Sequence, residues 1–338
     1  MTVATVAEHK VLRMGETNGG PYPMPGKLDA ARPMSVRAPL VLDLATIDST
    51  EKFGGFPGGG GIGVAIDIHI FLKIVPSAEW EVDIEPHAPV EHVCRALCNI
   101  LEYRGAFKIT SPEHASVPFD AAPEIITAAA AGVNAALGRP VGQRELRRII
   151  SWNMVGENDG RLELRPDTGV RVAGALFGGV VIVTDELEIA CRTPISEANP
   201  LILVMPSIEA NSLDFQKMVT IDEKDREKKA LEVLMKLMPA AIKSDVVKMG
   251  DSIYRLQLLG SKVVEIRRFK GGKEIYRLMS MMRVKGCEII GVHEETGIIA
   301  AYVNQQRLDE SLSLVDEAGL ERIITHPDNK GMKITLSK

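Results

Sequence analysis

The sequence predicts an α+β protein with two domains. First, 338 residues are too many for one ordinary hydrophobic core and suit two. Second, 45% hydrophobic and 25% charged residues form a globular composition. Third, runs of helices are mixed with hairpin strands, which is not the regular alternation of a doubly wound sheet. We expect a Pro/Gly-rich arm at residues 1–35, a first domain at residues 36–206 and a second domain at residues 207–338.

The arm is rich in proline, glycine and methionine, so it cannot form a helix and has little to bury alone. Two interpretations stay open. The arm is either a flexible tail or a segment that packs on the body or on a partner subunit.

The first domain should begin with two apolar strands. Residues 35–49 carry Val36, Leu40, Leu42 and Leu44 with the period of two that is typical of a strand. A glycine cluster then predicts a loop or tight turn. Residues 64–75 form the second strand.

Helices and shorter strands should follow. The clearest helix covers residues 119–140, where Pro123 suits the first turn, alanine fills the interior, and Gly138 and Pro140 end the helix. The other elements expected in the first domain are an amphipathic helix at 89–104, a strand at 105–113, a helix at 142–156, a glycine-rich turn feeding a buried strand at 169–186, and a strand at 199–207.

The second domain should be richer in helices. Its expected elements are a charged, then amphipathic helix at 221–242, further helices at 245–268 and 273–286, a hairpin at 287–304, and a helix with a strand at 309–327. The charged runs at 223–229 and 267–273 are interpreted as solvated faces.

Composition also argues against several classes of protein. The net charge of −5 does not attract nucleic acid, and 4% aromatic residues are too few for a surface on which bases stack. No apolar run reaches the roughly 18–20 residues of a membrane-spanning helix. The first residues lack the apolar region of a secretory signal, so we expect a cytoplasmic protein.

Four cysteines fit this expectation as reduced thiols: Cys94, Cys98, Cys191 and Cys287. Cys94 and Cys98, with His92 nearby, could in principle bind a metal. A closed zinc site needs about four ligands, however, and buried structural cysteines are favoured.

Four stretches between residues 36 and 304 carry short motifs in a familiar order. They are Pro39, Ile47 and Asp48 with Gly60, Gly61, Ile62 and Gly63; Pro112, Glu113 and His114; Thr168, Gly169 and Val170 with Phe177, Gly178 and Gly179; and the C-terminal run at 231–297. Their order and spacing resemble the GHMP kinase superfamily. Among its members, the chain is most similar to the β-ribofuranosylaminobenzene 5'-phosphate synthase (β-RFAP synthase) family.

The resemblance implies a GHMP fold with a ribosomal-S5-like N-terminal domain, a ferredoxin-like C-terminal domain and an active site between them. It also implies a homodimer, a phosphorylated small-molecule substrate and Mg²⁺. The family joins ribose 5-phosphate from phosphoribosyl pyrophosphate to 4-aminobenzoate or 4-hydroxybenzoate, with loss of CO₂ and pyrophosphate. The product feeds tetrahydromethanopterin-type cofactor biosynthesis.

The chain departs from the family at several motifs. The phosphate loop should contain glycines, yet none lies between Gly105 and Gly132, and Asp120 and Glu124 add negative charge at the helix start. This departure argues against ATP as a ligand.

Two other motifs also differ. Val41 and Asp43 stand where the synthases carry arginine and histidine. Acidic residues replace small ones in the turn between Gly291 and Gly297.

Three residues are candidates for catalysis. Asp48 could orient substrate or metal at a strand end, or simply cap a turn. His114 could act as an acid or hydrogen-bond donor near a phosphate, or lie on a surface loop. His293 forms a second titratable cluster with Glu294 and Glu295, which could face the cleft or be a solvated hairpin tip. For a metal, the candidates are Asp48, Glu294 and Glu295.

Candidates for holding the phosphates are glycines and cations. The glycines could form an anion-binding concavity or an ordinary hairpin connection, and the cations could be phosphate partners or surface charges. They are Gly58, Gly59, Gly60, Gly61, Gly291 and Gly297, with Arg171 and Lys262.

Three functions therefore stay open. The chain is a β-RFAP-synthase-like transferase, an ATP-dependent GHMP kinase with an atypical phosphate loop, or a non-catalytic GHMP-fold relative that binds a ligand or a protein.

Overall fold

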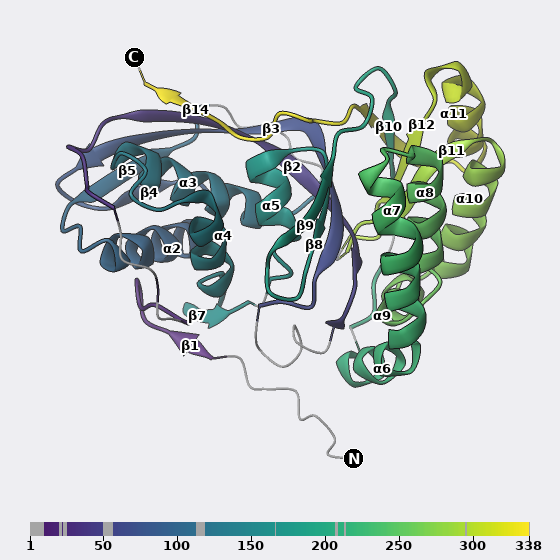
Figure 1. Cartoon of the computed structure of the whole chain (residues 1–338), viewed down its shortest axis with the longest axis horizontal. Coiled ribbons are helices and arrows are strands. Elements are labelled where there is room, and N and C mark those ends of the chain that lie inside the picture. The colour runs from purple at the N-terminus through teal and green to yellow at the C-terminus, as the bar shows by residue number, and fades with distance from the viewer. Residues whose placement is uncertain are drawn as a thin grey trace.

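A computed structural model of the chain describes residues 10–19, 22, 26–49, 57–112, 119–165, 167–206, 209–212, 214–294 and 296–337 (Figure 1). Its strands are β1 (Val11–Leu12), β2 (Met34–Thr46), β3 (Gly61–Ser77), β4 (Glu81–Asp83), β5 (Ala106–Thr110), β6 (Val155–Asn158), β7 (Arg161–Leu164), β8 (Val180–Val183), β9 (Ile189–Thr193), β10 (Leu201–Met205), β11 (Cys287–Val292), β12 (Ile299–Val303), β13 (Glu321–Thr325) and β14 (Lys333–Leu336). Its helices are α2 (His87–Ile100), α3 (Ala122–Ala136), α4 (Gln143–Trp152), α5 (Val170–Phe177), α6 (Phe215–Glu232), the π-helical η1 (Val233–Leu237), α7 (Met238–Ile242), α8 (Val246–Leu256), α9 (Ser261–Arg268), α10 (Gly272–Val284), the 3₁₀ turn η2 (Gln305–Arg307) and α11 (Leu308–Glu317).

The first domain is a sheet covered by helices. Strands β14, β2, β3, β5 and β4 lie in this order, with β8 and β9 continuing from β3. In Figure 1, α2 to α5 lie on one side of β2 and β3, and the segment that leads to β14 runs along the other. The predicted strand is confirmed as β2, and Val36, Leu40, Leu42 and Leu44 are all buried. From residue 38 onward the residues between them are buried as well.

The small residues of α3 allow the helix to lie close to the sheet. A Cβ atom on Gly132 would stand 2.0 Å from Ile74 Cδ1 of β3. The alanine-rich interior, which by itself favours a helix, is therefore also the surface that fits against the strands.

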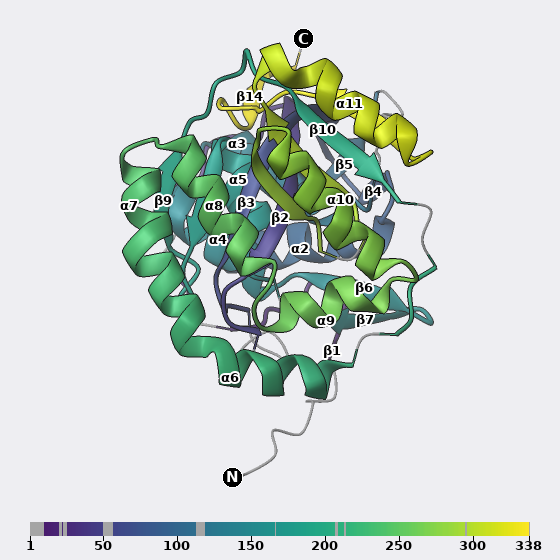
Figure 2. The ribbon, with the colours of Figure 1, turned by 90° about the vertical axis from the view of Figure 1, so that its right-hand side faces the viewer.

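The second domain is a four-stranded antiparallel sheet with helices packed against it. Its order, β11-β12-β10-β13, together with the chain order strand, helices, strand, strand, helix, strand, is that of a ferredoxin-like domain. Figure 2 shows helices α7, α8, α9 and α10 of this domain on the side toward the viewer, with α6 below them. The expected α+β architecture is confirmed.

The two domains share chain segments and a core. Strand β10 begins at Leu201, before the boundary placed at residue 206, and already pairs with β12 and β13. At the other end, β14 returns to pair with β2. One continuous cluster of buried side chains joins Leu42 and Leu44 to Ile253 and Tyr302 of the second domain.

The described part of the arm packs on the body. Strand β1 pairs with β7. The backbone N–H groups of Gly26 and Asp29 donate to the carbonyls of Pro140 and Leu137 at 2.8 and 3.0 Å. For these residues, the arm is a packed segment and not a flexible tail.

Several local predictions need correction. Residues 170–177 form the helix α5 where we expected a turn, because Gly169 starts the helix with a positive φ of 77° and the next residues pack on β2 and β8. The helix expected at 245–268 is divided into α8 and α9 at Gly260, whose φ is 60°. The small sheet of β1, β7 and β6 was not expected at all.

Within the described residues, every helix is too short or too polar to cross a membrane.

Two of the four cysteines lie in α2. Cys94 and Cys98 are buried free thiols there, and burial is the main cause that raises the pKa of Cys98 to about 12. Among the described residues, neither belongs to a group of three side chains that could hold a metal ion.

His92 makes the packing of the arm sensitive to pH. It is fully buried in α2, and its Nδ1 accepts a hydrogen bond from Gly15 N at 3.1 Å. Burial lowers the pKa of His92 to about 4. The unfolded chain therefore binds the proton first, and the folded state loses stability as the pH falls from about 6.5 to about 4.

We expect His92 to account for a loss of about 3 kcal/mol in the free energy of unfolding over this pH range. Urea titrations of the wild type and of His92→Gln between pH 7.5 and 4 would measure it. The difference between the two proteins should shrink as the pH falls, and a constant difference would contradict the assignment.

Candidate active site

The last part of β2 lies where the two domains meet. Residues 40–45 are buried on both faces of the strand, because α5 packs against one face while β11 and α8 pack against the other. Four polar residues lie in this last part of β2 or just after it: Asp43, Thr46, Asp48 and Ser49. We call these four residues the β2 junction.

Asp43 and His293 link the junction to the turn after β11. The backbone N–H of Asp43 donates to His293 Nδ1 at 3.0 Å. The same Nδ1 lies 3.3 Å from the carbonyl oxygen of Asp43. The N–H contact is the shorter of the two and needs an acceptor, which favours a neutral imidazole with its proton on Nε2. The hydroxyl of Thr168, just before α5, reaches Asp43 Oδ2 at 3.4 Å. His293 is therefore held as an Nε2–H donor.

Glu294 binds the same strand end. Its carboxylate accepts a short hydrogen bond from the hydroxyl of Thr46, and its backbone N–H donates to the carbonyl of Asp43 at 3.0 Å. Both residues of the turn are buried, so this side of the site is a fixed wall and not a solvated hairpin tip.

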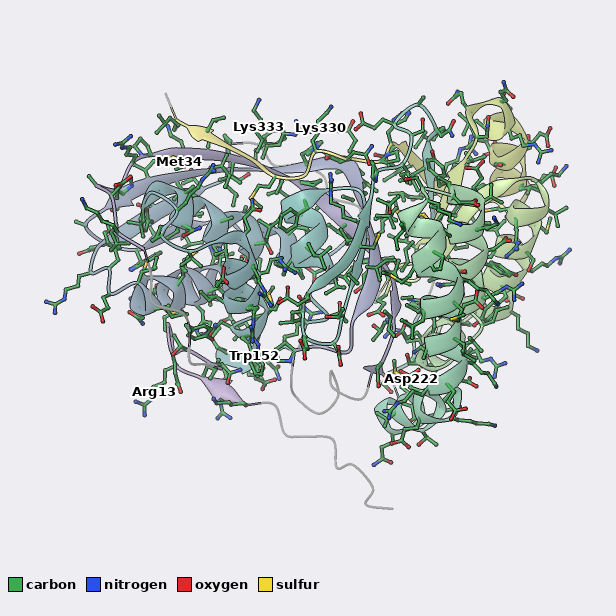
Figure 3. All side chains as sticks on the ribbon, viewed as in Figure 1. Arg13, Met34, Trp152, Asp222, Lys330 and Lys333 are labelled. Carbon is green, nitrogen blue, oxygen red and sulfur yellow. The ribbon has the colours of Figure 1, made fainter. Side chains whose placement is uncertain are left out.

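Helix α6 contacts the end of the junction at Asp48 and at Ser49. Arg226 Nη2 pairs with Asp48 Oδ2 at 3.2 Å. Asp222 accepts hydrogen bonds from Ser49 N at 2.9 Å and from the Ser49 hydroxyl. Figure 3 labels Asp222 on α6, close to the end of β2.

Asp222 also organises the second domain. Its Oδ1 accepts from Lys229 Nζ at 2.8 Å and from Ser261 N at 2.5 Å. Asp222 and Lys229 are both buried, so the run at 223–229 is not wholly a solvated face as we expected. The carboxylate joins α6, α9 and the β2 junction in one network.

A buried ion pair lies behind the junction. Arg171 Nε donates to Glu124 Oε1 at 2.8 Å, and the same oxygen accepts from Val41 N at 3.1 Å. Burial raises the pKa of Glu124 to about 6, although Arg171 acts in the opposite direction. The ring of Phe119 stands 4.6 Å from the ring of His293 and 5.9 Å from the Arg171 guanidinium.

The two carboxylates at the start of α3 therefore have cationic partners. Glu124 faces Arg171, and Asp120 Oδ2 lies 3.5 Å from Arg165 Nη1. Their charges were a reason to exclude a phosphate at this helix end, and these arginines offset them.

The predicted glycines of the first motif form a tight hairpin end. Ile47 N and Asp48 N donate to the carbonyls of Gly60 and Gly59 at 3.0 and 2.8 Å. Gly59 has a φ of 81°, and a Cβ atom there would stand 1.9 Å from the Asp48 carbonyl oxygen. The close packing of the hairpin explains these glycines without a ligand. Gly58 and Gly61 are buried in the same turn.

The other predicted residues are dispersed. Lys262 is buried and pairs with Glu265 at 3.0 Å. Gly291 lies in β11 against Leu44, and Gly297 lies against the Phe269 ring. His114 and Glu295 lie outside the described residues.

The two predicted magnesium ligands that the structure describes, Asp48 and Glu294, have separate partners. Asp48 pairs with Arg226, whereas Glu294 binds Thr46. Within the part of the chain that the structure describes, neither belongs to a group of three converging ligands. Magnesium is commonly held by one or two carboxylates and by the phosphates of its substrate.

Sequence reasoning missed several residues of this site. Asp43 offered a signal, because a carboxylate within the apolar stretch of β2 is unusual, but we recorded it only as a departure from the family. Asp222 and Lys229 offered none, since they are seven positions apart in a helix full of charges. Thr168 belonged to a motif of the resemblance but was not assigned a role in the site. Phe119 is a common residue type in loops and offered no local signal.

Comparison by sequence finds no relative, since no protein-family model and no curated protein matches. Solved structures do match. Homoserine kinase from Cytophaga hutchinsonii has a TM-score of 0.66 at 15% identity, over 91% of this chain and 98% of that chain. Mevalonate diphosphate decarboxylase from Enterococcus faecalis has a TM-score of 0.64 at 14% identity, over 91% of this chain and 100% of that chain.

The same kind of decarboxylase has been solved with MVAPP, AMPPCP and magnesium, and that structure matches with a TM-score of 0.65 at 13% identity, over 91% of this chain and all of that chain. Proteins of this architecture can thus hold an ATP analogue, and our expectation against ATP finds no support. At such low identity the likeness concerns architecture, and nearly the whole chain takes part in it. The chain has the fold of the GHMP small-molecule kinases.

Proposed function

We propose that this chain is a GHMP-fold transferase that acts on a phosphorylated small molecule at the β2 junction. The observation that carries the proposal is the convergence of buried Asp43, His293 and Glu294 with Arg226 and Asp222 where the domains meet. Sites at such contacts between domains are common for small molecules. The network also fixes its side chains before a substrate arrives, as transfer reactions require.

For the reaction, we propose that ribose 5-phosphate passes from phosphoribosyl pyrophosphate to 4-aminobenzoate or 4-hydroxybenzoate. A C–C bond forms between ribose C1 and the ring carbon that bears the carboxylate. The C–O bond to pyrophosphate and the C–C bond to the carboxylate break, which releases pyrophosphate and CO₂. The motif order of the β-RFAP synthases supports this choice.

The reaction requires stabilisation of the ribosyl cation, help for the departing pyrophosphate and binding of a phosphate, and the junction offers a group for each. The Asp43 carboxylate would stabilise the positive ribosyl centre, and His293 Nε2–H would donate to an oxygen of the departing pyrophosphate. Arg226 is half exposed beside Asp48 and would bind a phosphate.

The test is an assay with phosphoribosyl pyrophosphate, magnesium and 4-aminobenzoate labelled at the carboxyl carbon. We expect labelled CO₂ and pyrophosphate in equal amounts. Asp43→Asn should lower the rate at least about tenfold, because the neutral amide no longer stabilises the ribosyl cation. Exposed Asp185 on the loop after β8 is the matched control, and Asp185→Asn should leave the rate unchanged. Equal rates for the two variants would refute the role of Asp43.

A second function is favoured by the arginine partners of Glu124 and Asp120 and by the AMPPCP complex of the similar decarboxylase. It is ATP-dependent phosphoryl transfer to a small molecule such as homoserine. ATP with magnesium should then raise the melting temperature, and ADP should form with the acceptor. If ATP and phosphoribosyl pyrophosphate both bind without turnover, the chain is a ligand-binding relative.

A further inference from the structure

A polar cluster lies away from the β2 junction, where the end of the chain crosses the first sheet. Arg37 belongs to β2, Asp67 and His69 belong to β3, and Asp328 belongs to the segment at 326–331, which we call the C-terminal strap. Positions 37 and 43 of β2 are about 20 Å apart along an extended strand. Figure 3 labels Lys330 on the strap and Lys333 beyond it, along the outer side of the sheet.

The backbone here is built to bring these side chains together. The register of β2 and β3 shifts between Pro39 and Leu40, so that Asp67 and the residue after it bulge out of the ladder. The strap takes their place: Asp67 N donates to the carbonyl of His326 at 2.8 Å, and Asp328 N donates to the carbonyl of Ala65 at 2.9 Å. Such bulges change the direction of side chains and often lie next to functional sites.

Asp328 is held in one orientation. It is buried, and its Oδ1 accepts from Lys330 N and Gly331 N at 2.7 Å each. Burial would raise the pKa of Asp328, but the hydrogen bonds from His69 and from these two amides outweigh burial and lower it. Oδ2 of an ionised carboxylate therefore faces the cluster.

The hydrogen bonds around His69 cannot all be satisfied. Its Nε2 lies 2.6 Å from Arg37 Nη2, which can only donate, and 2.8 Å from Asp328 Oδ2, which can only accept. One ring nitrogen cannot accept from the arginine and donate to the aspartate at once. Either two donors or two lone pairs face each other at hydrogen-bond distance.

A metal ion would resolve this conflict, because Nε2 and Oδ2 would both direct lone pairs at it. Asp67 Oδ1 lies 3.4 Å from Nδ1, the other nitrogen of the same ring, and its exposed side chain can turn toward an ion on Nε2. One ligand atom from each of Asp67, His69 and Asp328 lies within 4.8 Å of the others. Arg37 Nη2 lies close to all three, at 3.9 Å from Asp67 Oδ1 and 3.2 Å from Asp328 Oδ2. A cation of the protein thus stands where the three ligands converge.

We propose that Asp67, His69 and Asp328 bind a divalent transition metal of the zinc type, and that Arg37 competes with the ion for this position. One imidazole and two carboxylates suit such an ion. The Arg37 side chain is 35% exposed and can turn into solvent. Bound metal would fasten the C-terminal strap to β3.

The surroundings leave room for the ion and for a further ligand. A cavity of about 220 Å³ opens beside the cluster and is lined in part by Glu197, His326 and Lys330. Three protein ligands with a fourth position open to water would be the resulting arrangement. This proposal is independent of the transferase reaction.

Calorimetric titration of the full chain with ZnCl₂, after treatment with a chelator and its removal, tests the proposal. We expect binding of one ion, with a melting temperature that rises with zinc and falls again with excess chelator. His69→Gln and Asp67→Asn should each weaken binding at least tenfold. Arg37→Met should strengthen it several-fold, because the competing cation is gone.

The control is His87→Gln, since His87 is an exposed histidine that also has a carboxylate neighbour, Glu85 at 3.0 Å. It should bind zinc like the wild type. Unchanged affinity in the His69 variant, or weaker binding in the Arg37 variant, would overturn the proposal. Asp67 is more than half exposed, so the Asp67→Asn variant should fold. Its zinc affinity therefore decides the test if the His69→Gln variant does not fold.

Discussion

Replacing Arg171 with methionine should lower the free energy of unfolding by about 3–5 kcal/mol, one of the two largest losses that we expect from a single substitution in this chain. Glu124 is fully buried, and Arg171 is the side chain that compensates its charge. Methionine has a similar length but cannot donate, so the ionised carboxylate would stay inside the protein without a cation.

The loss should depend on pH in a defined direction. Burial already raises the pKa of Glu124 to about 6, and removal of the guanidinium raises it further. Because a carboxyl group with a raised pKa destabilises the folded state when it ionises, the deficit should be greatest above pH 7 and should shrink as the pH falls toward 5.

Urea unfolding of Arg171→Met between pH 5 and 8 measures both effects. Arg95→Met is the matched control, because Arg95 pairs with the partly exposed Glu91 in α2 and its loss should cost about 1 kcal/mol or less. The double variant Glu124→Gln, Arg171→Met should recover part of the loss. A deficit that does not change with pH would show that lost packing, and not the buried charge, is responsible.

Asp222→Asn should destabilise the protein by about 3 kcal/mol, because the amide replaces a carboxylate that accepts four hydrogen bonds. In asparagine, an NH₂ group replaces one of the two carboxylate oxygens. This NH₂ group would face N–H or O–H donors and could not accept their hydrogen bonds. It also leaves the buried ammonium of Lys229 without its counter-ion.

This substitution should also release the strand end. Hydrogen exchange of Ser49 and Ser261 amides should accelerate, since both donate to Asp222. Glu223→Gln is the control on the same helix: Glu223 is an exposed carboxylate of α6, and its loss should cost about 0.5 kcal/mol or less. Equal losses for the two variants would mean that Asp222 has no special role in joining the domains.

Much of the fold could be predicted because its signals are local. The alternation of apolar residues in β2, the alanines of α3 with Pro123 and Gly138 at its ends, and the hairpin of β11 and β12 each depend on a few neighbouring residues. α5 was missed because its glycines suggested a turn, whereas packing on β2 and β8 decides the helix. The strand β14 was missed because its partner, β2, lies at the other end of the chain.

The site was predicted less completely, because many of its contacts join residues that are far apart in the sequence. Asp48, His293, Glu294 and Arg171 were chosen from motifs, and the structure places them around or behind the β2 junction. Their partners Thr46, Asp222 and Glu124 come from distant segments, so spacing along the chain could not identify them. The roles of these residues in a reaction remain a proposal for the assays above.

The pairing of β14 with β2 has a consequence for folding during synthesis of the protein. Strand β2 emerges early from the ribosome, but its first residues find their outer neighbour only after residues 333–336 have been synthesised. Until then the nascent first domain carries an open sheet edge, which can pair with other chains. Loss of the last residues at the C-terminus should therefore appear first as poor yield and aggregation in the cell, before any change in the chemistry of the site.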